Sequence, residues 1–139
     1  MTIEHFPPRG AAETVLAGLL RGLLKSLLKP VFSARVPIGF QRRWLRALSK
    51  LSLVPRGTAF EPAMVGGVPG EWVRTRQAPA RPGTLLYLHG GGYCLGAPAT
   101  HRALTARLAR ATGMALFAAD YRLAPEHAYP AGPDDCQAA

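Results

Sequence analysis

Apolar and polar positions alternate with a helical period over the first part of this chain. From Ala12 to Lys29, pairs of apolar residues recur every four positions, which predicts an amphipathic helix that ends at Pro30. A second amphipathic stretch, from Phe40 to Leu51, predicts another helix. Its expected apolar side consists of Phe40, Trp44, Leu48 and Leu51, with basic residues elsewhere. We therefore expect two helices before any strand.

The pattern changes to strands after Val54–Gly57. Thr58–Val65 and Glu71–Thr75 predict a hairpin whose strands are joined by a glycine-rich turn. Thr84–Leu88 and Met114–Ala119 are short, almost wholly apolar runs, which are typical of strands covered on both faces. We therefore expect helices to cover these last two strands.

A third helix, Thr100–Thr112, is predicted between the two apolar strands, and Gly113 is well placed to end it. Its expected inward residues are Ala103, Leu104, Leu108 and Ala111, and its expected outward residues are Arg102, Arg107 and Arg110. Strand, helix and strand form a βαβ unit, because parallel strands need such a crossover. The predicted fold class is therefore α/β, with a further helix beginning near Pro133–Asp135.

Composition narrows the classes of function. The 139 residues carry a net charge of +9, and residues 1–50 hold nine Lys and Arg against two Asp and Glu, a net +7. This basic segment is either a solvated helix face or a weak contact for an anionic membrane; nucleic acid is not expected, because no binding motif accompanies the charge. No Cys and His spacing suits zinc, so no metal is expected. Without a secretory signal or a long uncharged apolar run, the expected location is cytoplasmic.

Three glycines follow the strand that ends at Leu88, in the sequence His89-Gly90-Gly91-Gly92. Glycine lets backbone N–H groups approach a ligand with no Cβ in the way, which suits an anion. A phosphate is disfavoured, because neither GxGxxG nor Gly-Lys-Ser/Thr can be read here. The oxyanion of an acyl-transfer intermediate is favoured, and a tight turn without a ligand is the alternative.

Two motifs in register give the chain a family resemblance. The sequence HGGGYCLGAPATHRALTARLARATGMALFAADYRLAPEHAYPAGPDD, residues 89–135, resembles the hormone-sensitive-lipase-like family of α/β-hydrolases, which pairs HGGG with a later DYRLAPEH segment. The resemblance implies the N-terminal part of an α/β-hydrolase fold with a mixed, mostly parallel sheet. It implies a core over residues 54–139, whereas residues 1–53 resemble the family's helical cap region only loosely.

The resemblance also implies roles for the first motif. Gly90, Gly91 and Gly92 form the oxyanion loop, with the N–H groups of Gly91 and Gly92 as the expected donors. His89 braces this loop, and Tyr93 borders the substrate pocket.

In the second motif, Asp120, Tyr121 and Arg122 are expected to support the loop through charge-assisted hydrogen bonds. Asp120 and Glu126 could instead be an acid and base pair, but Arg122 is their expected ionic partner. Cys94 is an alternative nucleophile, although nothing nearby in the sequence would activate it.

The nucleophile that the resemblance implies, a serine in a G-x-S-x-G sequence, is absent from these 139 residues. The four serines all precede the glycine loop: Ser26, Ser33, Ser49 and Ser52. We therefore expect an N-terminal fragment of a serine carboxylic-ester hydrolase, acting in its full-length form on a small-molecule ester without a cofactor, and inactive alone. A membrane-surface binding module is the alternative function. The family's strand order also predicts that the strand ending at Leu88 lacks one neighbour here, and the oligomeric state stays open.

Overall fold

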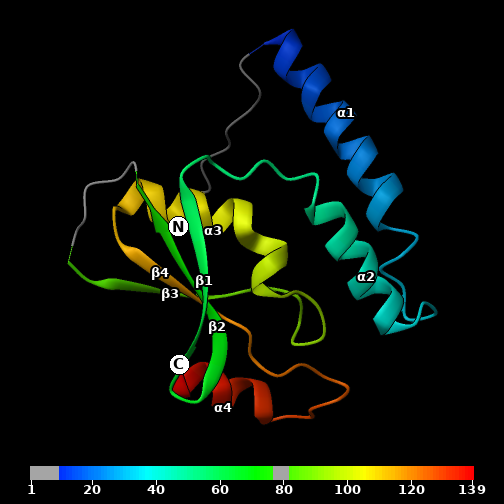
Figure 1. The fold of residues 1–139 in the computed structure, drawn as a ribbon. Coiled ribbons are helices and arrows are strands. Elements are labelled where there is room, and N and C mark those ends of the chain that lie inside the picture. Colours follow the sequence, from blue (N-terminus) through cyan, green and yellow to red (C-terminus); the bar gives the residue numbers. More distant parts are fainter. Residues whose placement is uncertain (1–9, 77–81) are drawn as a thin grey trace, which may run out of the picture. The chain divides into compact units, whose positions relative to one another are not determined.

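The computed structural model describes residues 10–76 and 82–139, which fall in two compact units (Figure 1). The first unit ends at Pro37 and contains helix α1 (Ala11–Leu28); the second begins at Ile38. Residues 1–9 of the predicted cap region lie outside the described residues. Helix α2 (Ile38–Ser49), which the resemblance groups with residues 1–53, belongs to the second unit with the sheet.

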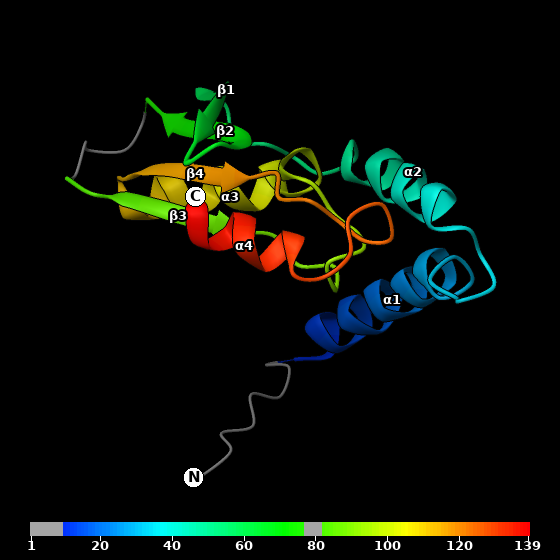
Figure 2. The same cartoon turned by 90° about the horizontal axis from the view of Figure 1, so that it is seen from below.

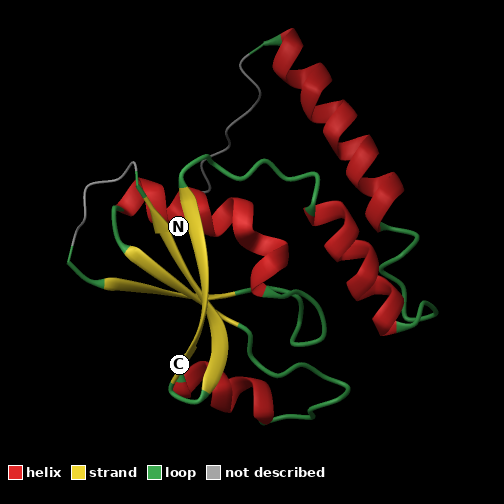
Figure 3. Ribbon diagram, in the orientation of Figure 1, coloured by secondary structure: helices red, strands yellow, loops and turns green. Residues whose placement is uncertain are grey.

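The second unit is built on a four-stranded mixed sheet. Its strands, yellow in Figure 3, are β1 (Thr58–Val65), β2 (Val68–Thr75), β3 (Thr84–Leu88) and β4 (Ala115–Ala119). Their spatial order is β1-β2-β4-β3. The predicted hairpin β1–β2 is confirmed, and β2 continues the sheet by antiparallel pairing with β4. β3 pairs parallel with β4, and the two are joined by helix α3 (Pro98–Thr112), which confirms the βαβ unit.

The hairpin turn is shorter than the sequence pattern suggests. Val65 pairs with Val68, which leaves Gly66 and Gly67 as the two turn residues, with φ values of 55° and 80°. Two residues of positive φ match the twist of a tight hairpin. The return strand therefore begins at Val68, three residues before the predicted start.

β4 is the centre of the hydrophobic core, because successive residues of a strand point to opposite faces. Leu116 and Ala118 join a cluster that includes buried residues of β2 and α3. Phe117 and Ala119 join a second cluster with Val68, against which the last residue after helix α4 (Ala131–Ala138) also packs (Figure 2). α3 and the end of α4 thus contact different clusters of the core.

The expectation that β3 is covered on both faces is wrong. Its residues alternate between half-buried and exposed, and Leu86 and Leu88 are 45% and 43% exposed. β3 lies at one end of the strand order, as the prediction of a missing neighbour requires.

The predicted inward face of α3 is also wrong in part. Leu104 and Ala111 are exposed, whereas the buried residues of the helix are Pro98, Thr105, Ala106 and Ala109. Small side chains face β2 and β4 because they let the helix backbone approach the sheet closely. In α2, likewise, Phe40 is exposed and Gln41 is the buried residue. Gly113 has φ 72° and ends α3 as predicted.

Candidate active site

Both sequence motifs lie at the same edge of the sheet. β3 and β4 are parallel neighbours, and Leu88 is paired with Ala119. The residues that follow, His89 and Asp120, therefore begin two adjacent loops at the carboxyl ends of these strands. Ligands of open α/β sheets bind at this edge.

The glycine loop is a tight turn closed by its own backbone. The carbonyl oxygen of Gly91 accepts hydrogen bonds from the N–H groups of Cys94 and Leu95, at 3.1 and 3.0 Å. Gly91 has φ 135°, and a Cβ there would overlap the carbonyl oxygen of Leu95. Only glycine fits this position without moving the turn.

The orientation of two peptide groups in this loop follows from their carbonyl partners. His89 Nδ1 lies 3.1 Å from the carbonyl oxygen of Gly90, and the carbonyl of Gly91 faces Cys94 and Leu95. In a planar trans peptide the N–H points opposite to the C=O. The N–H groups of Gly91 and Gly92 are therefore turned away from these partners, and no described residue accepts a hydrogen bond from either. Both glycines are exposed.

His89 anchors the loop from beneath. Its side chain is buried, its ring stacks on Tyr121 with the centroids 4.3 Å apart, and the Tyr121 hydroxyl donates to the His89 carbonyl oxygen. Burial lowers the pKa of His89, with the Gly90 carbonyl opposing this effect, so the imidazole is neutral at neutral pH. A hydrogen bond to the Gly90 carbonyl places the proton on Nδ1. Nε2 has no partner among the described residues.

Tyr121 remains a hydrogen-bond donor over the physiological pH range. Burial, assisted by Cys136, raises the pKa of its phenol to about 12. Its hydroxyl oxygen also lies 3.3 Å from His89 Nδ1. The second motif therefore contacts the glycine loop through a neutral tyrosine.

Arg42 is a site residue that sequence reasoning missed, because it lies on α2, far from both motifs along the sequence. Its Nε donates to the Cys94 carbonyl at 2.9 Å, and its Nη2 donates to the Ala124 carbonyl at 2.7 Å. Nη1 and Nη2 also bind the two carboxylate oxygens of Glu126, at 2.8 and 2.9 Å. The two loops are joined directly where the Ala124 N–H donates to the Tyr93 carbonyl, at 2.8 Å.

The predicted ionic partner of Asp120 and Glu126 is wrong. Arg122 binds Asp135 of α4 through its side chain and its N–H, whereas Glu126 is bound by Arg42. The hydrogen bonds from these arginines lower the pKa of Asp135 and of Glu126. Arg122 thus fastens α4 to the second motif, and the charged support of the glycine loop comes from α2. No ion pair of Asp120 is found within residues 10–76 and 82–139.

Tyr93 follows the glycines with φ 57°, unusual for a residue with a side chain, and its ring is about half exposed. The ring centroid lies 5.7 Å from that of Tyr121. A Cβ on Gly132 of α4 would come within 2.8 Å of Tyr93 Cδ1. Tyr93 is therefore held between Tyr121 and the start of α4, and borders the exposed side of the loop.

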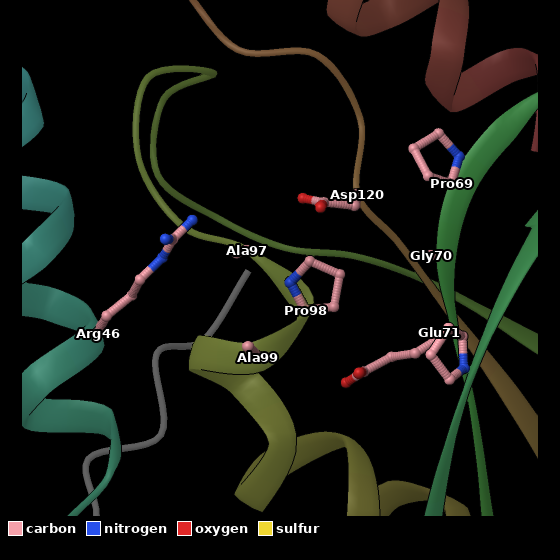
Figure 4. A pocket seen from close by; sticks show the side chains of 9 residues that line it. Arg46, Pro69, Gly70, Glu71, Ala97, Pro98, Ala99 and Asp120 are labelled. Carbon is pink, nitrogen blue, oxygen red and sulfur yellow. The ribbon is translucent and has the colours of Figure 1, made fainter.

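Asp120 belongs to a different space, an open cavity of about 240 Å³ (Figure 4). Arg46 reaches it from α2, Glu71 lies on β2, and Ala97–Ala99 open α3. Partial removal from water raises the pKa of Asp120, with His89 and Arg46 opposing this effect. Glu71 is already bound by Arg102, at 2.6 Å. The alternative acid and base pair is not favoured, since Glu126 is held by Arg42 and does not line this cavity.

Other candidate reactive groups are not brought into a catalytic arrangement. Cys94 and Cys136 are free thiols, and burial raises the pKa of Cys136, which disfavours its thiolate. In the described part of the chain, no three His, Cys, Asp or Glu residues gather in a way that could hold a metal ion.

Known proteins are similar to this chain in both sequence and fold. Residues 85–139 match a family described as the alpha/beta hydrolase fold. A protein named as an acetyl-hydrolase, LipR of Mycobacterium tuberculosis, is 42% identical over 103 residues, which are 73% of this chain and 33% of LipR. An acetyl-hydrolase of Streptomyces hygroscopicus is 48% identical over 75 residues, 54% of this chain and 24% of that protein. The chain thus spans about a third or less of the length of these relatives.

Solved structures agree with the sequence matches. A hormone-sensitive lipase from a metagenome library superposes with a TM-score of 0.74 at 37% identity, over 86% of this chain and 40% of that one. An esterase of the bacterial hormone-sensitive lipase family gives a TM-score of 0.73 at 33% identity, with the same coverage. This chain is therefore similar in sequence to the hormone-sensitive-lipase-like α/β-hydrolases and carries part of their fold.

Proposed function

We propose that this chain supplies the oxyanion-hole loop of a serine carboxylic-ester hydrolase that acts on small-molecule esters. The carrying observation is the orientation of two successive peptide groups. Their carbonyls, on Gly90 and Gly91, are bound within the loop, so the N–H groups of Gly91 and Gly92 face the exposed side. Donors fixed in advance stabilise a developing negative charge without reorganising during the reaction.

In the proposed reaction, a serine from polypeptide outside these 139 residues attacks the ester carbonyl. Its proton passes to a general-base histidine, and the carbonyl oxygen becomes an oxyanion that accepts the N–H groups of Gly91 and Gly92. The alcohol leaves with that proton, and water then hydrolyses the acyl-enzyme by the same steps. This route needs no cofactor. The solved esterase of the bacterial hormone-sensitive lipase family, to which this chain is 33% identical, supports an ester as the substrate class.

The first test uses the 139-residue chain alone. We expect no hydrolysis of p-nitrophenyl acetate above background, because none of its four serines stands in a G-x-S-x-G sequence. Release of p-nitrophenol that is blocked by a serine-reactive phosphonate would contradict this part of the proposal.

The second test places residues 38–139 of this chain in LipR, in place of the corresponding segment. The chimera is expected to hydrolyse p-nitrophenyl acetate, and Gly91→Ala is expected to lower its kcat/KM by about 100-fold, the loss typical of one displaced oxyanion donor. The added Cβ would overlap the Leu95 carbonyl and shift the turn.

Two further glycine variants make this test specific. A Cβ on Gly90 meets nothing within 4 Å, so Gly90→Ala is expected to lose less than about tenfold. Gly39→Ala, on α2 and also without a neighbour within 4 Å, changes a glycine away from the loop and serves as the matched control. Equal losses in Gly91→Ala and Gly39→Ala would rule out the oxyanion role.

A second function is favoured by one observation on α1, namely contact with an anionic membrane surface. Six large apolar side chains of this helix are about half or more exposed: Val15, Leu16, Leu19, Leu20, Leu23 and Leu24. At 100° per residue, Arg21 and Lys25 fall on the opposite side, as in helices that lie in a lipid interface. No helix among the described residues has the length and apolarity to cross a bilayer.

Vesicle sedimentation tests the membrane contact. The chain is expected to sediment with vesicles that contain an anionic lipid at low salt, and a Leu20→Glu variant is expected to remain in the supernatant. Equal sedimentation of both chains, or none of either, would dismiss this function.

A further inference from the structure

Arg42 is the one described side chain that binds both site loops by several hydrogen bonds at once. Its own side chain is 21% exposed, and all three guanidinium nitrogens donate. Two of the acceptors are backbone carbonyls, those of Cys94 and Ala124, which lie 52 and 82 residues along the chain. An exposed ion pair contributes little to stability, but a guanidinium with fixed backbone acceptors defines a geometry.

The contacts of Arg42 continue to the glycine loop without a gap. The N–H of Cys94, whose carbonyl Arg42 binds, donates to the Gly91 carbonyl. Ala124, the other carbonyl partner, donates its N–H to Tyr93. The segment from Gly91 to Cys94 is therefore held at both ends by groups that Arg42 binds.

We propose that Arg42 is a positioning residue that ties α2 to the glycine loop and so sets the direction of the N–H groups of Gly91 and Gly92. It touches no reacting atom and acts through Cys94 and Ala124. The consequence for the oxyanion rests on the proposed function; the mechanical link does not. Glu126 binds Nη1 and Nη2 of the guanidinium and so holds the planar group in the orientation in which it donates to the two carbonyls.

The first arm of the test measures amide hydrogen exchange by NMR in the 139-residue chain and needs no activity. In Arg42→Met, exchange of the Cys94, Leu95 and Ala124 amides is expected to rise about tenfold or more, because their hydrogen bonds lose the group that holds the turn. The Asp120 amide, which donates to Pro69 in the sheet, is expected to change less than about twofold and reports on folding.

Three variants sharpen this arm. Arg43→Met, an exposed neighbour on the same helix, is the matched control and is expected to leave all four amides unchanged. Arg42→Lys keeps the charge without the fork, so an intermediate rise is expected. Glu126→Gln, which keeps both carbonyl contacts, is expected to raise exchange less than Arg42→Met does. An equal rise at Asp120, or none at Cys94 and Leu95, would overturn the proposal.

The second arm uses the LipR chimera and separates this proposal from the proposed function. Arg42→Met is expected to lower kcat about tenfold or more and to leave KM within about twofold. Misdirected N–H donors stabilise the transition state less well but do not change how tightly the ester binds. A raised KM with unchanged kcat would overturn the positioning role. If the unmutated chimera is inactive, the proposed function fails, and the exchange arm still decides whether Arg42 holds the loop.

Discussion

His89 performs two structural tasks, and the second, which is to fill a buried position, favours the neutral imidazole. Its Nδ1–H orients the Gly90 carbonyl, while its ring fills a buried position 3% exposed against Tyr121. A charged imidazole would lose hydration there, which is why burial lowers its pKa.

The stability of the chain is therefore expected to depend on pH through His89. The unfolded histidine takes up a proton as the pH falls through about 6.5, whereas the folded one stays neutral to lower pH, so the unfolded state binds more protons in this window. The free energy of unfolding should fall as the pH is lowered below 6.5, by at most about 1.4 kcal/mol per pH unit. Urea unfolding followed by tryptophan fluorescence measures this.

His89→Asn provides the comparison for this prediction, because an amide N–H can still reach the Gly90 carbonyl and does not titrate. The variant is expected to be less stable at neutral pH but to show a flatter pH profile between 6.5 and 5. Parallel profiles for the two chains would show that folding does not lower the pKa of His89.

At the residue scale, the sequence indicated that the two motifs lie together but not which charged residues bind them. Three glycines after an apolar strand and a DYRLAPEH segment after the next one must meet, because parallel neighbours end at the same sheet edge. The pairs Arg42–Glu126 and Arg122–Asp135 could not be predicted, because several acids and bases offered equal charge. Choosing among them requires the position of α2 and the path of the loop after Asp120.

Among the elements, α3 shows how backbone approach overrides an apolar pattern. Ala106 and Ala109 are buried against β2 and β4, whereas the larger Leu104 is exposed. Ala106→Leu should therefore overpack this contact and lower the free energy of unfolding by about 1–3 kcal/mol in urea titrations.

Ala111→Leu, at an exposed position of the same helix, is the control and should change stability by less than about 0.5 kcal/mol. The opposite ranking would mean that the face predicted from the sequence, with Ala111 inward, is the correct one.

α3 is also tied to the hairpin by charge. Glu71 of β2 is 6% exposed and accepts three hydrogen bonds from Arg102, which lies over the Phe60 ring at 4.8 Å. Arg102→Leu keeps apolar contact with Phe60 but leaves a buried carboxylate without its cation. We expect a loss of about 2–3 kcal/mol in the free energy of unfolding, measured by urea titration.

Arg110→Leu removes an exposed cation from the same helix and should cost less than about 0.5 kcal/mol. A loss in Arg102→Leu no larger than this would show that Glu71 finds other partners or water.

The sequence predicted the bounds of the strands well, because a short local pattern determines them. It failed to predict the burial of β3, because burial depends on which elements pack against the strand. Alternation and turn residues predicted every strand to within a few residues. The run Thr84–Leu88 reads as doubly covered, yet burial of an apolar strand depends on its neighbours, and β3 has β4 on one side only in the described sheet.

At the scale of the whole molecule, the open edge of β3 predicts self-association. Its unpaired N–H and C=O groups stand beside exposed Leu86 and Leu88, a combination that favours pairing with a second chain. The net charge of +9 opposes this, so association should increase with salt. Sedimentation velocity of the 139-residue chain over a range of concentrations is expected to show species larger than a monomer.

Leu86→Lys places a charge on this edge and should shift the distribution toward monomer. Leu104→Lys makes the same substitution at a similarly exposed leucine, 47% exposed on α3, and should leave it unchanged. Equal effects of the two variants, or a monomer at all concentrations, would contradict association through β3.

The strand order β1-β2-β4-β3 has a consequence for how the chain assembles during synthesis. β4 is made after both of its neighbours and enters between them, so the hairpin and β3 gain no common sheet until residue 119 has emerged from the ribosome. The glycine loop must wait longer, for Tyr121, Ala124 and Glu126. In the nascent chain, the glycine loop therefore lacks these contacts until the second motif has emerged from the ribosome.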